Sequence, residues 1–410
     1  MTAPEPRVVI AGGGHAGGSA AALLRQMGWA GQIVVIGQEP LPPYERPPLS
    51  KAWLKGEADA ESLALRPASF YASANIQLRL GCTVDAIDRD AMTVTLSDGE
   101  SLRYQHLILA LGARPRRIPL PGLDLPGVLE LRTAADADLL KQALGPGRRL
   151  AVVGGGYIGL EAAASARALG AEVIVLEREA RLLARIASPP LSEFFAAQHR
   201  AHGVDIEVNA FVEAVVGSNG RVCGVGLADG RILEADTVLV GVGAVPNEEL
   251  ARHAGLACDG GIVVDEAART GDSAIYAIGD CTRRPVPLYG RTMRLESVPN
   301  ALEQARQAAA AICGKPQPTP EVPWFWSDQY DIRLQIAGIP FDATEVVLRG
   351  NLEEGRFALF HLTEDGIVQA VEAVNASQEF MGGRRIIARR KRLDPERISD
   401  PGVTMQQLAA

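Results

Sequence analysis

Two glycine-rich segments of the same design constrain the fold of this chain more than any other feature. The first reads "VVIAGGGHAGG" at residues 8–18, and the second reads "VVGGGYIGLEA" at residues 152–162. Each follows a short apolar run, opens an Ala-rich segment and is followed by another apolar run. A strand, a tight glycine turn, a helix and a second strand within about 30 residues make a β-α-β unit. Two such units, starting 154 − 12 = 142 residues apart, predict a duplicated α/β fold.

Both segments have the G-x-G-x-x-G spacing that binds the phosphates of a dinucleotide. In such a turn the glycines allow the backbone to bend sharply and to approach a pyrophosphate, and the helix N-terminus supplies unpaired N–H donors. A simple tight turn would explain one isolated match, but the strand before and the helix after each motif favour two dinucleotide sites. The glycines concerned are Gly12, Gly14 and Gly17 in the first motif and Gly154, Gly156 and Gly159 in the second.

An acidic residue follows each motif at about the distance where dinucleotide folds bind a ribose hydroxyl. Glu39 comes just after the expected strand at 32–37, and Glu177 ends the expected strand at 171–177. A carboxylate there repels the 2′-phosphate of NADPH, so Glu177 predicts NADH as the electron donor. Three arginines weaken this exclusion because one of them can accept a phosphate, namely Arg178, Arg181 and Arg185.

Composition and charge exclude several classes of protein. The 410 residues are 47% hydrophobic and 22% charged, which is typical of a globular protein of two to four domains, and we take three. A net charge of −8 argues against general nucleic-acid binding. The N-terminus lacks the basic and apolar regions of a signal peptide, and the chain has no apolar run of membrane-spanning length. We therefore expect a cytoplasmic protein without membrane contact.

The five cysteines are scattered, with no C-x-x-C pair, at Cys82, Cys223, Cys258, Cys281 and Cys313. This pattern indicates a reducing compartment and argues against a dithiol reductase that works through a local redox disulfide. We expect Cys281 to be a buried structural thiol and assign no metal ligand.

The remaining segments suggest how the domains follow one another. Residues 83–111 alternate like short strands, a similar alternation ends in "ADTVLVGVGAVPN" at 235–247, and the Pro-rich linker 314–323 precedes a tail with strands of its own.

Five further stretches carry a family resemblance. They are "PYERPPLSK" at 43–51, "LALGARP" at 109–115, "AIYAIGDC" at 274–281, "RLESVPNALEQA" at 294–305 and "PWFWSDQYDIRLQIAG" at 323–338. Together with the glycine motifs they resemble the NADH-dependent, FAD-containing ferredoxin reductases of bacterial oxygenase systems, of the putidaredoxin-reductase and biphenyl-dioxygenase-reductase type. The resemblance spans almost the whole chain.

This resemblance implies a glutathione-reductase-like α/β fold with two Rossmann-type dinucleotide-binding domains and a C-terminal α+β interface domain. The FAD-binding domain would comprise 1–113 and 244–320, the NAD-binding domain 114–243, and the interface domain 321–410. The flavin would accept two electrons as hydride from NADH and release them one at a time.

The motifs and the resemblance together assign the cofactor-binding residues. Asp280 would bind the FAD ribityl chain, Arg46 and Lys51 would line the flavin pocket, and a helix starting at Asn300 would point its positive end at the flavin. The full set is Gly12, Gly14, Gly17, Glu39, Arg46, Lys51, Ala110, Gly112, Asp280, Val298, Trp326, Gly154, Gly156, Ile158, Gly159, Glu177, Arg185 and Gly243.

Lys51 and Glu161 are the predicted catalytic residues. The resemblance places Glu161, in the first turn of its helix, opposite Lys51 where the nicotinamide meets the flavin, and a buried carboxylate there needs a cationic partner. The pair would organise hydride transfer without taking a proton from NADH. Alternatively, Glu161 only complements the helix dipole and Lys51 is a solvated charge.

The predicted electron acceptor is a [2Fe-2S] ferredoxin that supplies a P450 or Rieske-type oxygenase. The basic segment "RRIIARRKR" at 384–392 would attract an acidic ferredoxin, or it is simply a solvated helix face. The aromatic residues Trp324, Phe325, Trp326 and Tyr330 would cover the flavin, or pack in a core.

Two other functions stay open: reduction of rubredoxin or a small molecule, and redox signalling like that of the apoptosis-inducing-factor group. Ser50 stands where peroxidase relatives carry a reactive cysteine, and oligomeric state is left open.

Overall fold

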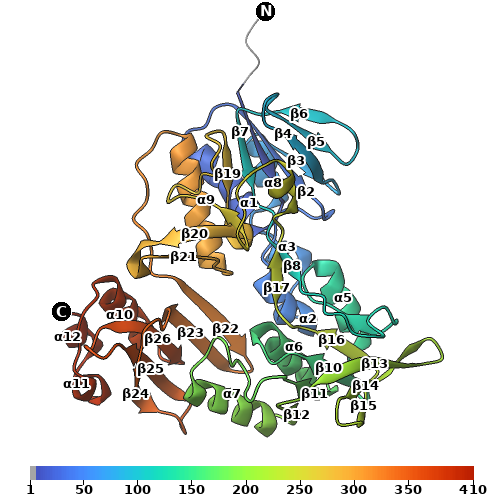
Figure 1. The fold of residues 1–410 in the computed structure, drawn as a ribbon, viewed down its shortest axis with the longest axis vertical. Helices are drawn as coiled ribbons and strands as arrows, with labels where there is room; N and C mark the ends of the chain where they lie inside the picture. Colours follow the sequence, from blue (N-terminus) through green and yellow to red (C-terminus); the bar gives the residue numbers. More distant parts are fainter. Residues whose placement is uncertain (1–5) are drawn as a thin grey trace, which may run out of the picture. The chain divides into compact units, whose positions relative to one another are not determined.

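The computed structural model describes residues 6–410, and the chain divides into two compact units (Figure 1). Unit 1 comprises the residues up to Glu45, Ala60–Arg114 and Val245–Phe325. Unit 2 comprises Arg46–Asp59, Pro115–Ala244 and Trp326–Ala410. Each unit is therefore built from segments that are far apart in the sequence.

A five-stranded parallel sheet forms the centre of unit 1, with strand order β19-β7-β1-β2-β3. Its strands are β1 (Arg7–Ala11), β2 (Gln32–Gly37), β3 (Ile76–Leu80), β7 (His106–Leu109) and β19 (Ile275–Ala277). The strands β1 and β2 are almost entirely buried, as expected where both faces of a parallel sheet are covered. The expected β-α-β unit is thus confirmed.

Both faces of this sheet carry a hydrophobic core. On one face α1 (His15–Gln26) and α9 (Val298–Ile312) pack side by side, where Leu24 and Ala305 meet Ile10 and Val35 (Figure 1). On the other face Ala11 and Ile36 pack among side chains from the smaller sheet β4-β5-β6. Small alanines on α1 and α9 allow the two helices to approach closely.

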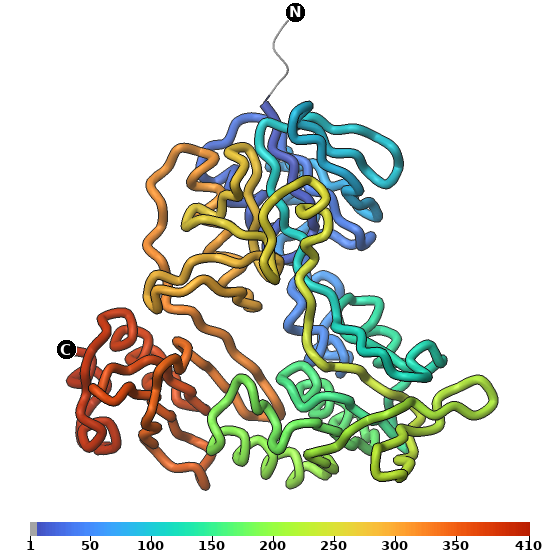
Figure 2. Tube along the Cα trace, viewed as in Figure 1, coloured from blue at the N-terminus to red at the C-terminus, as the bar shows by residue number. Residues whose placement is uncertain are grey.

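The three segments of unit 1 interleave along the trace in Figure 2. Its remaining elements are α3 (Ala60–Leu63), α4 (Ala68–Ser73), β4 (Val84–Asp88), β5 (Thr93–Leu96), β6 (Ser101–Arg103), α8 (Glu249–His253), β18 (Ile262–Val263), η2 (Gly279–Cys281), β20 (Thr282–Val286), η3 (Pro287–Tyr289) and β21 (Arg291–Met293). The strands β8 (Ala113–Pro115) and β17 (Ala244–Pro246) lie where the chain passes from one unit to the other.

Unit 2 repeats the parallel sheet with the order β12-β11-β10-β16-β9. Here β10 takes the place of β1, with β11 and β16 on either side, so the duplication predicted from the glycine motifs is confirmed. The elements of this part are η1 (Pro47–Ser50), α2 (Ala52–Lys55), β9 (Val128–Leu129), α5 (Ala134–Ala143), β10 (Arg149–Val153), α6 (Tyr157–Ala168), β11 (Glu172–Leu176), α7 (Pro189–Ala201), β12 (Val204–Glu207), β13 (Val212–Ser218), β14 (Arg221–Leu227), β15 (Ile232–Glu234) and β16 (Thr237–Val240).

The C-terminal part of unit 2 is an antiparallel sheet of order β22-β23-β26-β25-β24, packed against α10. This is the mixed α and β composition expected for the tail. Its elements are β22 (Trp324–Gln329), β23 (Ile332–Gly338), β24 (Glu345–Asn351), β25 (Arg356–Leu362), β26 (Val368–Val374), α10 (Ser377–Ala388), α11 (Pro395–Ser399) and α12 (Met405–Ala409).

Two local predictions need correction. The helix expected to start at Asn300 begins at Val298, because Ser297 caps it by accepting the N–H of Asn300. Glu161 lies in the second turn of α6, whose first turn has no acidic residue. The alternative that Glu161 merely complements the helix dipole loses support, since that effect is confined to the first turn.

The two units do not reproduce the three predicted domains as separate bodies. Arg46–Asp59 lies in unit 2, apart from the rest of the expected FAD-binding segment, and Trp326–Ala410 lies in the same unit as Pro115–Ala244. The three-domain division stays a prediction. Across residues 6–410 no helix combines the length and apolarity needed to cross a bilayer.

Candidate active site

The first glycine motif, in unit 1, forms a turn that admits no larger residue. Gly12 has a φ of +120°, and a Cβ atom on it would lie 2.1 Å from the carbonyl oxygen of Ala110. A Cβ on Gly17 would lie 1.9 Å from the carbonyl oxygen of Gly12. Gly14 is the N-cap of α1 and has no side chain that could cap the helix, so the first N–H groups of the helix are left for other acceptors.

Several predicted FAD ligands lie around this turn. Asp280, in η2, is close enough to His15 at the start of α1 to influence its pKa, and a Cβ on Gly279 would touch Ala16 at 3.1 Å. Burial lowers the pKa of His15 to about 4 although Asp280 opposes the shift. Glu39 follows β2, and its carboxylate accepts the hydroxyl of Tyr44 at 2.6 Å.

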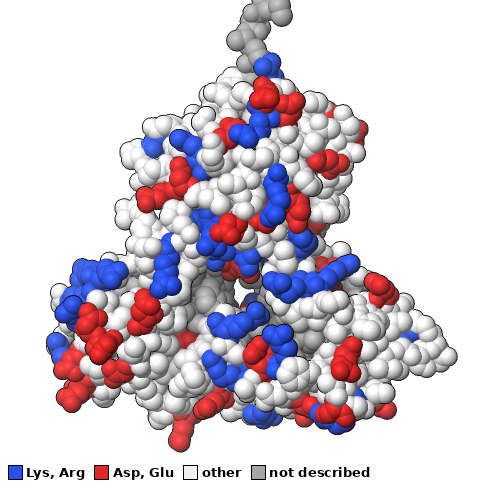
Figure 3. All heavy atoms as spheres, viewed as in Figure 1, with Lys and Arg blue, Asp and Glu red and all other residues white. Residues whose placement is uncertain are grey.

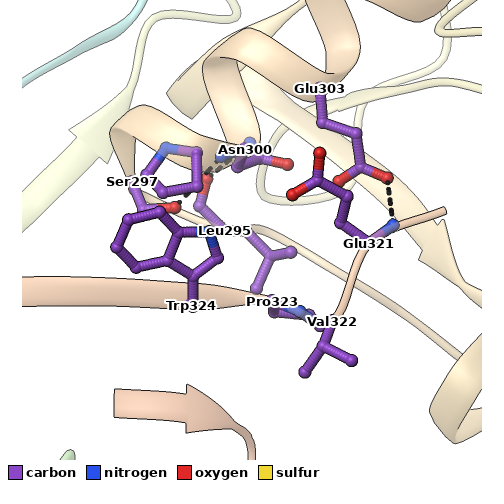
Figure 4. Close-up of a pocket in the computed structure, with 9 residues that line it drawn as sticks. Leu295, Ser297, Asn300, Glu303, Glu321, Val322, Pro323 and Trp324 are labelled. Atoms are coloured by element: carbon purple, nitrogen blue, oxygen red, sulfur yellow. Dashed lines mark hydrogen bonds between the residues drawn. The ribbon is translucent and has the colours of Figure 1, made fainter. Parts of the chain in front are cut away.

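The start of α9 forms a small recess in the same unit, and Figure 4 shows the ring of Trp324 beside Ser297 and Asn300 there. The Asn300 amide donates to the carbonyl of Leu295 at 2.8 Å and accepts from Arg284 at 3.0 Å. Arg284 also pairs with Glu303 inside the protein, at 3.0 Å. Asn300 therefore has a structural role, and Val298 presents the first N–H group of the helix.

These observations fit a bound dinucleotide. The turn requires glycine at Gly12 and Gly17, the start of α1 has no side-chain cap, and the buried Nδ1 of His15 has no hydrogen-bond partner within residues 6–410. Phosphate groups satisfy such donors at a helix N-terminus. The predicted FAD-binding residues that lie in unit 1 are Gly12, Gly14, Gly17, Glu39, Ala110, Gly112, Asp280 and Val298.

The second glycine motif, in unit 2, repeats this geometry. Gly154 has a φ of +111°, and a Cβ on it would lie 2.5 Å from the carbonyl oxygen of Gly241. A Cβ on Gly159 would lie 2.4 Å from the carbonyl oxygen of Gly154, while Gly156 caps α6 and faces open space. This second cradle has the same chemistry as the first.

Glu177 lies directly after β11, with its carboxylate at the second glycine turn. One oxygen accepts the N–H of Gly155 at 2.7 Å and the other accepts the N–H of Glu179 at 2.8 Å. The carboxylate is therefore oriented by the backbone on both sides. This is the position from which an acidic residue binds a ribose hydroxyl.

The three nearby arginines differ in the protein groups that they contact. Arg178 pairs with Glu179 at 3.0 Å, and Arg181 donates to the carbonyls of Ala184 and Ala187, both at 2.8 Å. Arg185 is exposed, and its guanidinium lies 3.9 Å from the Cβ position of Gly243. Arg185 and Gly243, together with the exposed Ile158, are the predicted ligands at the open side of this turn.

Lys51 and Glu161 form a partly buried ion pair in unit 2, with Nζ and Oε2 at 2.6 Å. Glu161 is only 6% exposed, which makes a solvated or unpaired carboxylate untenable. Lys51 also donates to the carbonyl of Pro47 at 3.0 Å, so η1 holds the ammonium in place. The contact that the resemblance implies is present.

Two serines complete the environment of the Glu161 carboxylate, and the sequence did not predict this. Ser50 Oγ donates to Oε2 at 2.5 Å, and Ser327 Oγ donates to Oε1 at 2.6 Å. Ser50 is itself fixed because its carbonyl accepts from Ser165 at 2.7 Å. The one sequence signal for Ser327 is its place next to Trp326, on the opposite face of β22.

Two further predicted residues lie in unit 2. Arg46 donates to the carbonyl of Arg132, and Trp326 is half-buried. The residues that unit 2 brings together are Arg46, Lys51, Gly154, Gly156, Ile158, Gly159, Glu161, Glu177, Arg185, Gly243 and Trp326. The aromatic residues Trp324 and Phe325 are half-buried, which does not decide between covering the flavin and packing in a core.

The thiols take no part in these contacts. Among residues 6–410 all five cysteines are free, and no cysteine bonds to the Lys51–Glu161 pair. Cys281 is fully buried, and burial raises the pKa of its thiol to about 12, which suits the structural role expected for it.

Comparison with known proteins agrees with this chemistry. Residues 6–305 match the pyridine nucleotide-disulphide oxidoreductase family and residues 324–409 match a reductase C-terminal domain. A probable ferredoxin reductase, CtmF, of Castellaniella defragrans is 52% identical over 100% of both chains. Rhodocoxin reductase of Rhodococcus erythropolis is 45% identical over 96% of this chain and 92% of its own.

Solved structures show the same relationship. In the covalent complex of putidaredoxin reductase with putidaredoxin, a matching chain has a TM-score of 0.96 and 43% sequence identity, covering 99% of this chain and 98% of its own. The likeness therefore extends over almost the whole chain. The chain therefore belongs to the pyridine nucleotide-disulphide oxidoreductases, among the ferredoxin reductases that use FAD and NAD(H).

Proposed function

We propose that this protein oxidises NADH and passes the electrons through FAD, one at a time, to a [2Fe-2S] ferredoxin that supplies a P450 or Rieske-type oxygenase. The observation that carries the proposal is the partly buried Lys51–Glu161 ion pair beside the second glycine turn, in a chain whose described cysteines form no disulfide. When bound, the flavin supplies the chemistry that couples two-electron and one-electron transfer. A protein with this arrangement needs no redox disulfide.

The glycine turns and the family resemblance together suggest the roles of the chain's own residues. Gly12, Gly14 and Gly17 bind the FAD pyrophosphate with the donors of α1, and Asp280 binds the ribityl chain. Gly154, Gly156 and Gly159 bind NADH in the same way, with Ile158, Arg185 and Gly243 at the open side of the turn. The phosphate-binding assignments are supported by the two glycine turns and by the absence of a side-chain cap on α1 and α6, and the other roles are those that the resemblance implies.

The Lys51–Glu161 pair organises the place where the nicotinamide reacts. Lys51, Ser50 and Ser327 donate to the Glu161 carboxylate, so three protein groups stabilise its negative charge at a site that is only 6% exposed. A fixed charge of this kind costs no reorganisation during hydride transfer. Neither residue is required to take a proton from NADH.

Glu177 makes NADH the preferred donor. Its carboxylate is oriented by two backbone N–H groups and carries the negative charge that repels a 2′-phosphate. Arg181 binds loop carbonyls instead of facing this position, which removes one of the three cations that would favour NADPH.

Anaerobic stopped-flow absorbance tests the proposal. The holoenzyme is first reduced with NADH or NADPH and then mixed with oxidised [2Fe-2S] ferredoxin, and both chromophores are followed. We expect fast reduction by NADH and rapid single-electron transfer to the ferredoxin. Fast flavin reduction without ferredoxin turnover would instead assign the protein to rubredoxin, a small-molecule acceptor or redox signalling.

Residue substitutions test the catalytic pair within the same experiment. Glu161→Gln, which keeps the shape of the side chain, is expected to slow flavin reduction by about 10- to 100-fold without loss of FAD, since about 1.4 kcal/mol of barrier corresponds to tenfold. The same flavin-reduction rate in this variant would rule out a role for the pair.

We further propose a cytoplasmic location, which the five free cysteines support.

A further inference from the structure

A chain of buried hydrogen bonds leads away from the Glu161 carboxylate through the interior of unit 2. Ser327 Oγ lies 2.6 Å from Glu161 Oε1, and Gln329 Nε2 lies 3.1 Å from Ser327 Oγ. Beyond Gln329, its Oε1 lies 2.8 Å from His199 Nε2, and His199 Nδ1 lies 3.0 Å from the Tyr330 hydroxyl. We call Ser327, Gln329, His199 and Tyr330 the donor chain.

The geometry of three elements produces this chain. Ser327 and Gln329 are two residues apart on β22 and therefore point to the same, buried face. Tyr330 has a φ of +57° in the turn after β22, which directs its hydroxyl to His199 on α7. Glu161 comes from α6, so the donor chain joins two helices and one strand.

The carboxylate determines the direction of every bond in the donor chain. Since ionised Glu161 only accepts, the single Ser327 proton must point to it, and Gln329 must donate its amide N–H to Ser327. The amide then presents its oxygen to His199, so His199 carries its proton on Nε2. Nδ1 is left as an acceptor for Tyr330, and all four donors point towards Glu161.

Burial favours a single set of hydrogen-bond directions in the donor chain. His199 and Ser327 are 0% exposed and Gln329 is 1% exposed, so water does not compete for these bonds. Burial lowers the pKa of His199 to about 4, with the Gln329 bond opposing the shift and His202 adding to it. The ring is therefore neutral near pH 7, as the required tautomer demands.

We propose that His199 is a positioning residue for the hydride-transfer site, acting through Gln329 and Ser327 to orient the Glu161 carboxylate and stabilise its charge. Consecutive bonds of one direction polarise each other, so the last donor, Ser327, binds the carboxylate more strongly than an isolated hydroxyl would. This inference rests on the proposed role of Glu161 and adds a residue that lies outside the cofactor sites.

The first test is spectroscopic and needs no turnover. Long-range ¹H–¹⁵N correlation spectra of the imidazole rings in the oxidised holoenzyme should show His199 as the neutral Nε2–H tautomer from pH 5.5 to 8. His199→Phe identifies its signals. A predominantly Nδ1–H ring, or a ring that titrates near its ordinary pKa, would overturn the proposal.

The second test measures flavin reduction by stopped flow with saturating NADH. His199→Phe should retain FAD and lower the rate by about 3- to 10-fold, with little change in the Kd of NADH, and His199→Gln should restore part of the rate because an amide can also donate to Gln329. His202→Ala is the matched control, because His202 stacks on Tyr330 at 3.7 Å but lies outside the donor chain. Equal rates for wild type and His199→Phe would refute the proposal.

A double substitution separates this inference from the proposed function. If Glu161→Gln slows flavin reduction, His199→Phe should have no further effect in that background, because both changes remove the same interaction. If Glu161→Gln has no effect, the role of the catalytic pair fails, while the tautomer measurement still decides the structure of the donor chain. Should His199→Phe lose FAD, the isosteric Gln329→Glu replaces it, because a carboxylate cannot donate to Ser327.

Discussion

At the scale of single residues, two acidic side chains each accept several hydrogen bonds from the protein. Glu161 accepts from one ammonium and two hydroxyls, and Glu177 accepts from two backbone N–H groups. In both cases the acidic residue could be selected from the sequence by its distance from a glycine motif. Of the partners of Glu161, Lys51 was implied by the family resemblance, whereas Ser50 and Ser327 were not predicted, because they are distant from Glu161 in the sequence.

Replacing Glu177 should change coenzyme preference. Glu177→Ala removes the ribose acceptor and the negative charge, so we expect the ratio of kcat/KM for NADPH to that for NADH to rise by about tenfold or more. Steady-state kinetics with both coenzymes measures this ratio. Glu213→Ala, at an exposed position on β13, is the control, and an equal ratio in wild type and Glu177→Ala would contradict the assignment.

The buried His199 should make stability sensitive to acid. Its pKa is lowered to about 4, so below about pH 6.5 the unfolded chain binds a proton that the folded protein does not. Wild type should lose up to about 1.4 kcal/mol per pH unit from this residue as the pH falls from 6.5 to 4, and His199→Gln should lack that loss.

Urea unfolding of both proteins at pH 7 and pH 5 measures this difference. The lowered pKa of His15 contributes to both proteins and cancels in the comparison. The groups facing His199 are Gln329, Tyr330 and His202, and they are unchanged in the variant. Parallel pH dependence in the two proteins would show that His199 titrates normally.

At the scale of elements, helix α7 is capped by a residue from another part of unit 2. Glu372 on β26 is 3% exposed and accepts the N–H of Ser188 at 2.9 Å and also the Ser188 hydroxyl. His361 on β25 lies 3.2 Å from the same carboxylate. A carboxylate at a helix N-terminus is stabilising, and here it also anchors the loop that carries Arg185.

Removing this cap should destabilise the protein. Ser188→Ala leaves a buried carboxylate with one donor fewer, so we expect a loss of about 1–3 kcal/mol in the free energy of unfolding. Urea unfolding measures the loss, and Ser218→Ala, at an exposed position on β13, serves as the control. A loss as small as that of the control would mean that the hydroxyl contributes nothing to the cap.

In the basic segment on and after α10, some of the arginines bind other groups of the chain. Arg385, Arg389, Arg390 and Arg392 are exposed, and basic side chains gather over this part of the chain in Figure 3, with acidic ones beside them. Arg389 donates to the carbonyl of Ala409 at 2.6 Å and Arg392 pairs with Asp365 at 2.8 Å. Arg385 and Arg390 are both exposed, and we choose this pair to test whether the segment meets an acidic ferredoxin.

Reversing these two charges tests docking at this surface. Arg385→Glu combined with Arg390→Glu should raise the KM for ferredoxin by about 3- to 30-fold at low salt and leave flavin reduction by NADH unchanged. The difference should shrink in high salt, where the Debye length is short. Arg221→Glu, at an exposed position on β14, is the control, and an unaltered KM would place the docking site elsewhere.

At the scale of the whole molecule, the sequence predicted those elements that are specified by a local pattern of residues. The glycine turns, the strands beside them and the strands of the tail all follow from patterns within about 30 residues. The start of α9 and the turn occupied by Glu161 were each misplaced, because capping depends on which side chain bonds to which N–H group. The assignment of Arg46–Asp59 to unit 2 likewise depends on tertiary contacts.

By itself the sequence determined the duplicated α/β fold, the two dinucleotide cradles and the acidic residue that follows the second, because each is specified by residues close together along the chain. Only the tertiary structure decided that Ser50 and Ser327 share the Glu161 carboxylate with Lys51, that His199 supports it from α7, and that Glu372 accepts the N–H of Ser188 at the start of that helix. These bonds join residues 110 or more positions apart, such as Lys51 and Glu161 or Ser327 and Glu161. No local pattern encodes such partners, since they meet only when hydrophobic burial has brought their elements together.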